Sequence, residues 1–290
     1  MQKKNKRSNN VNSKSNFRDK RRNDAPQARS KAPKREAASV DEDEVKDLFF
    51  EGRNAVMELL NSDKTIHRLF VKQGDIEGSL KVIIAKAKEK GIIISPMAKD
   101  KLDELSETGK HQGVIALCPP FEYAYLGDVL RDVASKGEEP FLVILDKIVD
   151  PYNFGAIIRT ACAAGAHAII IPKRRSVGIT AAVVRASAGT AGNMPVVRVS
   201  NIAQTIDALK QAGIWTVGTC MDGQLIYDAP LKGPIAVVVG NEDEGISRLV
   251  KEKCDFLVSM PMGGRVESLN ASVAAGVAIY EVVRHRSFKN

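Results

Sequence analysis

Three short segments of the chain combine amide, charged and glycine residues in patterns that suit a ligand-binding site. The first runs from Asp150 to Gly155 and is followed by Arg159. Asp-Pro with Asn153 shortly after it is typical of a turn that leads into a helix, with Asn153 as the capping residue. Turn chemistry does not explain Arg159, because an unpaired guanidinium among apolar residues is costly to bury. We therefore expect Arg159 to bind an anion, and a substrate phosphate suits its planar guanidinium.

The second segment follows an apolar run and contains Gly240, Asn241, Glu242 and Gly245. A glycine loop in this position can bind phosphate at the start of a helix, but three successive carboxylates would repel a phosphate. The chain also lacks the G-x-G-x-x-G sequence of dinucleotide-binding folds. An acidic loop suits a ligand with ribose or adenine donors or with a positive charge. The alternative is an acidic first turn that the helix dipole stabilises.

The third segment spans residues 260–272 and is rich in glycine and polar residues. Its candidate ligand-contacting residues are Met260, Met262, Ser268, Leu269 and Asn270. It leads into a helical pattern of small residues, which permit close packing of a partner helix. Ser268 or Asn270 could instead serve only as the cap of that helix.

Each of these segments follows one of a series of continuous apolar runs. Such runs are typical of parallel strands that are buried on both faces. The runs occupy residues 141–148, 168–171, 196–199, 214–219, 235–240 and 256–260. Helical patterns at 154–164, 180–188, 202–212 and 246–253 lie between them, and a last one at 269–284 follows. This alternation predicts an α/β domain over residues 140–290, with a mostly parallel sheet and helices on both faces. Ligands bind at the carboxyl ends of strands in such sheets, where the three segments lie.

The rest of the chain divides into three parts. Residues 47–120 alternate shorter helical and strand-like patterns and predict a small α/β domain, and residues 121–139 read as a linker with one helix near residues 126–134. Residues 1–46 read as a disordered basic tail, because 13 of the 43 Lys and Arg lie in the first 40 residues with few large apolar side chains. Such a tail can gain affinity for RNA by releasing counterions, or it can serve solubility alone.

Composition excludes several classes of protein. The chain is 44% hydrophobic, with a mean hydropathy of −0.16, but its apolar runs are far shorter than the about 18 residues of a membrane-spanning helix. The basic start of the chain lacks the apolar stretch of a secretory signal, so we expect a cytoplasmic protein. The four cysteines lie far apart with no C-x-x-C pair, so neither a disulfide framework nor a metal site is expected.

Order and spacing make the three segments far more specific together than singly. The sequences D-P-x-N-x-G-x-x-x-R-T-A, V-G-x-E-x-x-G and P-M-x-G-x-x-x-S-L-N-x-S resemble the three motifs of the SpoU (TrmH) family of RNA ribose 2′-O-methyltransferases. Residues 52–56 (Gly-Arg-Asn-Ala-Val) and 111–114 (His-Gln-Gly-Val) resemble the small RNA-binding domain, similar to certain ribosomal proteins, of members that methylate a guanosine of 23S rRNA. Departures are slight: Asp243 replaces a frequent small residue and Ala271 a common valine.

The resemblance implies a SPOUT fold with a carboxyl-terminal trefoil knot, S-adenosylmethionine as methyl donor, RNA as substrate and a homodimer through the knot. It assigns the cofactor to Thr219, Gly240, Asn241, Glu242, Gly245, Met260, Met262, Ser268, Leu269 and Asn270. It assigns catalysis to Arg159, Asn153, Glu242, Ser268 and Asn270, with Ser268 and Asn270 near Arg159. RNA binding falls to Arg53, Arg159 and the basic run Lys173, Arg174 and Arg175.

Arg159 has two possible roles in this scheme. A guanidinium with a pKa above about 12 is a poor general base, so we prefer a clamp that binds the adjacent phosphate and stabilises the developing alkoxide. Two other functions remain open: a tRNA-directed enzyme of the same family, and a noncatalytic RNA-binding or ribosome-assembly factor. The intact motif residues argue against the noncatalytic factor.

Overall fold

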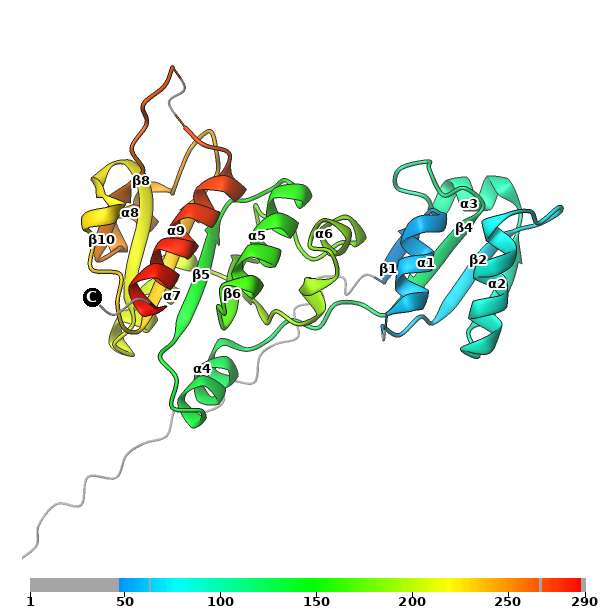
Figure 1. Ribbon diagram of the computed structural model, residues 1–290, viewed down its shortest axis with the longest axis horizontal. Coiled ribbons are helices and arrows are strands. Elements are labelled where there is room, and N and C mark those ends of the chain that lie inside the picture. The colour runs from blue at the N-terminus through cyan, green and yellow to red at the C-terminus, as the bar shows by residue number, and fades with distance from the viewer. Residues whose placement is uncertain (1–46, 63, 266–267, 288–290) are drawn as a thin grey trace, which may run out of the picture. The chain divides into compact units, whose positions relative to one another are not determined.

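The computed structural model describes residues 47–62, 64–265 and 268–287, which form a four-stranded sheet and a six-stranded sheet (Figure 1). The basic tail predicted over residues 1–46 lies outside the described residues. None of the helices in the described ranges is long and apolar enough to cross a membrane.

The small sheet has the strand order β1-β4-β2-β3. Its strands are β1 (Leu48–Glu51), β2 (Arg68–Lys72), β3 (Ile93–Met97) and β4 (Val114–Cys118), and its helices are α1 (Arg53–Asn61), α2 (Ser79–Glu89) and α3 (Lys99–Leu105). Strand β4 is antiparallel to both β1 and β2, whereas β2 and β3 are parallel. The apolar side chains of Val56, Leu60, Leu69, Leu80 and Ile83 are completely buried between the sheet and the helices. Strand β1 is not evident from the sequence, because four residues are too few to show a period.

The large sheet has the strand order β10-β8-β9-β5-β6-β7, and each neighbouring pair of its strands is parallel. Its strands are β5 (Phe141–Asp146), β6 (Ala168–Pro172), β7 (Val196–Val199), β8 (Trp215–Leu225), β9 (Ile235–Gly240) and β10 (Phe256–Ser259). Its helices are α4 (Leu126–Ser135), α5 (Pro151–Ala163), α6 (Ala181–Ala186), α7 (Ile202–Gln211), α8 (Arg248–Lys253) and α9 (Ala271–Ser287), with 3-10 turns at Thr190–Gly192 and Ile226–Asp228. The mostly parallel α/β sheet expected from the apolar runs is confirmed.

Helices cover both faces of the large sheet. Along β5, Phe141, Val143 and Leu145 pack in one apolar cluster with α5, α6 and α9. The alternate residues Leu142 and Ile144 pack in a second cluster with α4, α7 and α8. This double burial explains why β5 reads as a continuous apolar run in the sequence. Helix α4, which the sequence places in a linker, thus belongs to the core of the large domain.

The pairing of β8 with β10 changes register part-way along β8. Leu257 pairs with Gly218, but the next residue, Val258, pairs with Gln224, so five residues of β8 leave the register between them. Gly223 lies at the return point, where an added Cβ would come within 2.6 Å of the backbone of Leu257. The strand expected over 214–219 therefore continues to Leu225, and the looped-out residues reach the carboxyl edge of the sheet.

Candidate functional site

Helix α5 begins at Pro151, and Asp150 is its cap. The Asp150 carboxylate accepts hydrogen bonds from the backbone N–H groups of Tyr152 (3.3 Å) and Asn153 (3.0 Å). The expectation that Asn153 caps this helix is wrong, because Asp150 already occupies that position. The side chain of Asn153 is consequently available for other contacts.

Asn153 is joined to residues from both other motif segments. Its Nδ2 donates a hydrogen bond to Oε1 of Glu242, and its Oδ1 accepts one of 2.9 Å from Nδ2 of Asn270. The same Asn270 amide lies 3.4 Å from Oε1 of Glu242. Asn153 is buried, with 9% of its surface exposed. The structure thus brings three of the predicted catalytic residues into one hydrogen-bonded network.

The order of strands in the sheet brings Asn153 and Glu242 together. Strand β5 lies beside β9, with Asp146 opposite Gly240 at their carboxyl ends. The chain runs from β5 toward β6 and β7 on one side and returns to β8 and β9 on the other. Parallel sheets bind ligands at such a switch point, because the loops after the two strands diverge to opposite faces. Asn153 and Glu242 follow the two strands that flank it.

Two glycines shape the acidic loop that carries Glu242. An added Cβ on Gly240 would overlap the backbone of Gly245, so the chain can fold back on itself here only without a side chain. The Gly245 N–H donates a 2.8 Å hydrogen bond to the Asn241 carbonyl, and Gly245 has a φ of 65°. A left-handed φ favours glycine at this position as well. Gly240, Asn241 and Gly245 therefore set the loop backbone.

A second set of contacts anchors the acidic loop to the end of β5. The Lys147 ammonium lies 2.6 Å from Oε2 of Glu244, and the Lys147 carbonyl accepts a 3.4 Å hydrogen bond from Asn241. The buried Asp146 carboxylate accepts one of 2.7 Å from the backbone N–H of Ser247. The hydrogen bond from Lys147 holds the pKa of Glu244 below its usual value. Sequence reasoning missed Lys147; the only local signal is a lysine directly after a buried strand.

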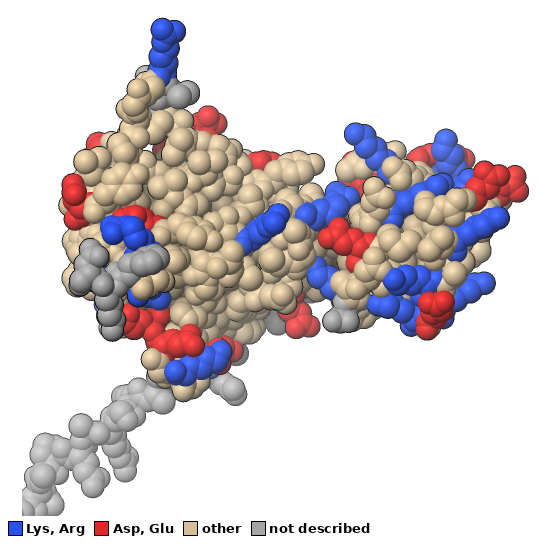
Figure 2. All heavy atoms as spheres, viewed as in Figure 1, with Lys and Arg blue, Asp and Glu red and all other residues tan. Residues whose placement is uncertain are grey.

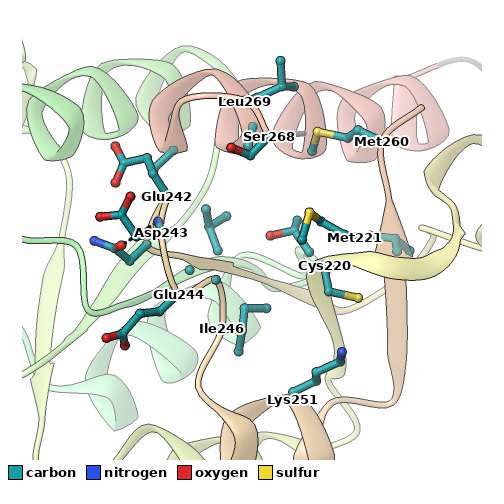
Figure 3. A pocket seen from close by; sticks show the side chains of 18 of the residues that line it. Cys220, Met221, Glu242, Asp243, Glu244, Ile246, Lys251, Met260, Ser268 and Leu269 are labelled. Atoms are coloured by element: carbon teal, nitrogen blue, oxygen red, sulfur yellow. Dashed lines mark hydrogen bonds between the residues drawn. The ribbon is translucent and has the colours of Figure 1, made fainter. Parts of the chain in front are cut away.

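A cavity of about 590 Å³ lies between the looped-out part of β8, the acidic loop and the segment before α9 (Figure 3). The predicted cofactor residues that line it are Thr219, Gly240, Asn241, Glu242, Gly245, Met260, Met262, Ser268 and Leu269. Asn270 does not line the cavity, but it contacts Glu242 at the edge. In Figure 3, Glu242, Ser268 and Met260 lie on one side of the cavity and Lys251 on the opposite side.

The charge of the cavity is predominantly negative. Its described lining includes the carboxylates of Asp222, Glu242, Asp243 and Glu244, and Lys251 is the single cation among them. That cation is already paired, because its Nζ lies 2.6 and 2.8 Å from the two carboxylate oxygens of Asp222. Lys251 was not expected at the site, since a lysine in a charged helix carries no distinguishing signal. The lining suits a cationic ligand and disfavours a phosphate.

Arg159 differs from its expected environment. The residue is exposed, and within the described residues it makes no hydrogen bond or ion pair. The expectation of a costly buried guanidinium is therefore wrong, since α5 turns this side chain toward solvent. Arg159 does not line the cavity, and none of the contacts described above joins it to Ser268 or Asn270. An exposed, unpaired guanidinium is nevertheless free to take an anion from solution.

The other predicted RNA-binding residues lie in two places. Arg174 and Arg175 are exposed in the loop after β6, beside the partly buried Lys173. Arg53 lies at the start of α1 in the small domain, where its Nε donates a 3.2 Å hydrogen bond to the Gln112 carbonyl. Arg53 thus holds the loop before β4, a structural role that the sequence did not indicate.

The remaining candidate side chains are the cysteines and the possible metal ligands. All four cysteines are free. Burial raises the pKa of Cys254 to about 12 and that of Cys118 to about 11. Across the part of the chain that the structure describes, no group of three or more His, Cys, Asp or Glu side chains is arranged to hold a metal ion.

Comparison with known proteins identifies the family. The profile of the SpoU rRNA Methylase family matches residues 140–280, and a profile described as RNA 2′-O ribose methyltransferase substrate binding matches residues 49–124. The Bacillus subtilis protein YacO, assigned to the TrmH family of tRNA/rRNA methyltransferases, is 46% identical over 81% of this chain and 95% of its own length. The chain belongs to the SpoU (TrmH) family.

Other members of the SpoU family agree with this assignment. A Staphylococcus haemolyticus protein, also assigned to the TrmH family of tRNA/rRNA methyltransferases, is 44% identical over 83% of this chain and 97% of its own length. The crystal structure of the SpoU methyltransferase AviRb from Streptomyces viridochromogenes in complex with AdoMet is 26% identical, with a TM-score of 0.61 over 83% of this chain and 91% of that chain. The crystal structure of an AdoMet-bound rRNA methyltransferase from Sinorhizobium meliloti is 25% identical, with a TM-score of 0.63 over 85% of this chain and 90% of that chain.

Membership of the SpoU family confirms the general assignment made from the motifs. Enzymes of this family transfer a methyl group to RNA, and the ribose 2′-hydroxyl is the acceptor named for the domain matched at residues 49–124. S-adenosylmethionine is the methyl donor of the family, and the AviRb structure contains it. The enzyme class and the cofactor expected from the sequence are thereby confirmed.

Proposed function

We propose that this protein methylates the 2′-hydroxyl of a guanosine ribose in 23S rRNA, in the cytoplasm, with S-adenosylmethionine bound in the acidic cavity. The observation that carries the proposal is the Asn153–Glu242–Asn270 network, which borders that cavity at the switch point of the sheet. A noncatalytic RNA-binding protein would need no such network beside a ligand cavity.

The cavity fits the cofactor in size and in chemistry. Its volume of about 590 Å³ lies within the range of about 300 to 1,000 Å³ that is usual for small-molecule sites. The apolar side chains of Val239, Ile246 and Leu269 offer contacts to a base, and the carboxylates complement a sulfonium and an ammonium group. When bound, the cofactor supplies an electrophilic methyl group on its sulfonium.

The three motif residues position the reacting groups in this proposal. Glu242 accepts hydrogen bonds from two amides, so its carboxylate is held in one orientation at the rim of the cavity. Asn270 in turn is held from both sides, because its Oδ1 accepts a 2.6 Å hydrogen bond from the Ser272 hydroxyl. Such fixed groups reduce the reorganisation that an in-line transfer requires. Ser268 lines the cavity on the same side and completes the site.

Arg159 serves as the clamp for the RNA backbone. Its guanidinium is exposed and unpaired in the described structure, so a phosphate next to the target ribose can accept two hydrogen bonds from it. The same positive charge favours the alkoxide that develops as the 2′-hydroxyl loses its proton. A guanidinium does not accept that proton near neutral pH, and the proton leaves to water.

RNA recognition extends beyond the catalytic residues. Arg174 and Arg175 are exposed in the loop after β6 and, with Lys173, would contact phosphates. The domain over residues 49–124 matches a substrate-binding profile, and Arg53 shapes one of its loops. The basic tail would add affinity through counterion release.

The homodimer and the knot belong to the same proposal. Helix α9 exposes Val273 (50%) and Tyr280 (51%), which lie seven residues apart on one helical face. Figure 2 shows few charged side chains over the neighbouring surfaces of α5 and α9. Exposed apolar side chains on a surface with few charges support an interface at this helix. The close approach of Gly223 to the backbone of Leu257, 34 residues later in the chain, supports a threaded chain in the same region.

Mapping of 2′-O-methyl groups tests the substrate. A strain that lacks this protein should lose one ribose methylation in 23S rRNA, and the purified wild-type protein with S-adenosylmethionine should restore it. A methyl group lost from tRNA instead would favour the tRNA-directed alternative. Loss of no methyl group from any cellular RNA would favour the noncatalytic one.

A further inference from the structure

The segment that enters the large domain, residues 121–125, lies along the edge of the large sheet. The Ala124 N–H donates a 2.8 Å hydrogen bond to the Val196 carbonyl, and Ala124 forms a parallel bridge with Val197. Strand β7 is the edge strand there, so this segment pairs with the edge of the sheet through a single bridge. The backbone of residue 124 is thereby held against the large domain.

Tyr123 reaches from this segment to the loop that follows β6. Its Oη accepts a 2.9 Å hydrogen bond from the backbone N–H of Ile179. Gly178 leaves room for this approach, because a Cβ there would lie 2.9 Å from the Tyr123 oxygen. Phe121 supports the ring in an edge-on contact, with 5.2 Å between centroids. Tyr123 therefore holds the far end of the loop over residues 173–179.

Arg198 holds the near end of the same loop. Its guanidinium carbon lies 5.0 Å from the centroid of the Tyr123 ring, and its Nη2 donates a 3.1 Å hydrogen bond to the Lys173 carbonyl. Its Nε is buried with no hydrogen-bond partner among the described residues. An unsatisfied buried N–H is costly, so simple packing would favour an apolar side chain here. The hydrogen bond to the loop and the stack on Tyr123 account for an arginine.

The middle of the loop contacts the catalytic segment. The Val177 N–H and the Ser176 hydroxyl donate hydrogen bonds of 2.9 and 3.0 Å to the Ile148 carbonyl, two residues before Asp150. Arg175 has a φ of 59°, an uncommon conformation for a residue with a side chain. Such a conformation persists only where the surroundings hold it. The contacts at both ends and in the middle of the loop supply that constraint.

We propose that Tyr123 and Arg198 are positioning residues for the RNA substrate: together they hold the loop over residues 173–179 so that Arg174 and Arg175 face the phosphates of the bound RNA. The inference rests on the proposed function, in which this loop contacts RNA. It adds that the segment entering the large domain, through one tyrosine hydroxyl and one stacked guanidinium, sets the geometry of that contact.

Tyr123→Phe isolates the hydroxyl, because the variant keeps the ring and its stack on Arg198 but loses the acceptor for the Ile179 N–H. We expect KM for RNA to rise about three- to tenfold, the size of effect expected from one hydrogen bond, while kcat at saturating RNA and the Kd for S-adenosylhomocysteine stay within twofold. The salt dependence of RNA binding should also become shallower, because a displaced loop makes fewer phosphate contacts. Arg198→Met should show the same pattern more strongly.

Tyr125→Phe is the matched control. It removes a hydroxyl from the same segment, but Tyr125 is exposed and its hydroxyl has no hydrogen-bond partner among the described residues. This variant should bind RNA as the wild type does. An Arg174→Ala/Arg175→Ala double variant completes the set: adding Tyr123→Phe to it should weaken RNA binding no further, since coupled residues are not additive.

Three results would overturn the inference. Tyr123→Phe with an unchanged KM and salt slope, while the double arginine variant binds RNA weakly, would show that the loop needs no positioning. A fall in melting temperature with a matching loss of cofactor affinity in Tyr123→Phe would show a general structural role. Unchanged RNA binding by the double arginine variant would remove the loop from the interface; methyl transfer by the wild type, measured separately, would then still support the proposed reaction.

Discussion

Asn270, just before the carboxyl-terminal helix, donates a 2.9 Å hydrogen bond to Asn153, which lies 117 residues earlier in the chain. Both amides also contact one carboxylate oxygen of Glu242. The Glu242 carboxylate can only accept hydrogen bonds, so both neighbouring side chains must supply an N–H donor, as an asparagine amide does. The first prediction follows from this arrangement.

Asn153→Asp should lower methyl transfer strongly near neutral pH, because a second carboxylate would replace the donor that faces Glu242. Two adjacent carboxylates favour sharing a proton, so one pKa of the pair rises. Activity of the variant should therefore recover in part as the pH falls, whereas wild-type activity should not rise in that direction. A pH–rate profile of both proteins measures this; parallel profiles would contradict the role given to the amide.

Arg159→Ala should reduce methyl transfer by about 10²- to 10³-fold, the loss seen when one donor to a developing oxyanion is removed. The stability of the variant should differ little from wild type, because the exposed guanidinium has no partner in the described structure. Calorimetry should show unchanged binding of S-adenosylhomocysteine.

Arg159→Lys separates a clamp from a proton acceptor. A lysine keeps the charge but loses the planar fork, so a clamp predicts little rescue. Recovery that increases with pH toward the lysine pKa would instead favour a base at this position, and wild-type activity in the alanine variant would exclude Arg159 from the reaction.

Lys147→Met should weaken binding of S-adenosylhomocysteine about two- to fivefold, as expected for the loss of a partly exposed ion pair. The reason is that Lys147 holds Glu244 and with it the acidic loop. Added salt should narrow the difference from wild type. Arg248→Met, which breaks the exposed pair between Arg248 and Glu252, is the matched control and should leave affinity unchanged. Equal affinity of Lys147→Met and wild type would show that the loop is stable without this contact.

Glu281→Gln should destabilise the protein at neutral pH but not in acid. Hydrogen bonds from Arg284 hold the pKa of the buried Glu281 carboxyl below its usual value of 4.5. A lowered pKa in the folded state stabilises the protein above pH 4.5, and that stabilisation is lost as the pH falls through the folded value. Melting temperatures of the two proteins should thus converge as the pH falls below 4.5, whereas Glu252→Gln, at an exposed position, should follow wild type throughout. A constant difference across this range would contradict the assignment.

The sequence by itself determined the repeating unit of the large domain and the family. Continuous apolar runs such as Phe141–Leu145 are local, and burial on both faces requires them. The motif segments are local too, so their residue types predicted the chemistry before any contact was known. The same reasoning placed the cap of α5 at Asn153 instead of Asp150, because both residues are good caps and only the backbone path distinguishes them.

Tertiary structure alone decided which of these residues meet. Glu242 contacts Asn153 because β9 lies between β8 and β5 in the sheet. The hydrophobic pattern of a single strand does not predict which strands will be its neighbours. The same holds for the loop of β8 that lines the cavity and for Lys147, whose partner is 97 residues away. Exposure of Arg159 is also a tertiary fact: its helix has apolar neighbours in sequence, but packing against α6 and α9 decides which face of α5 remains in solvent.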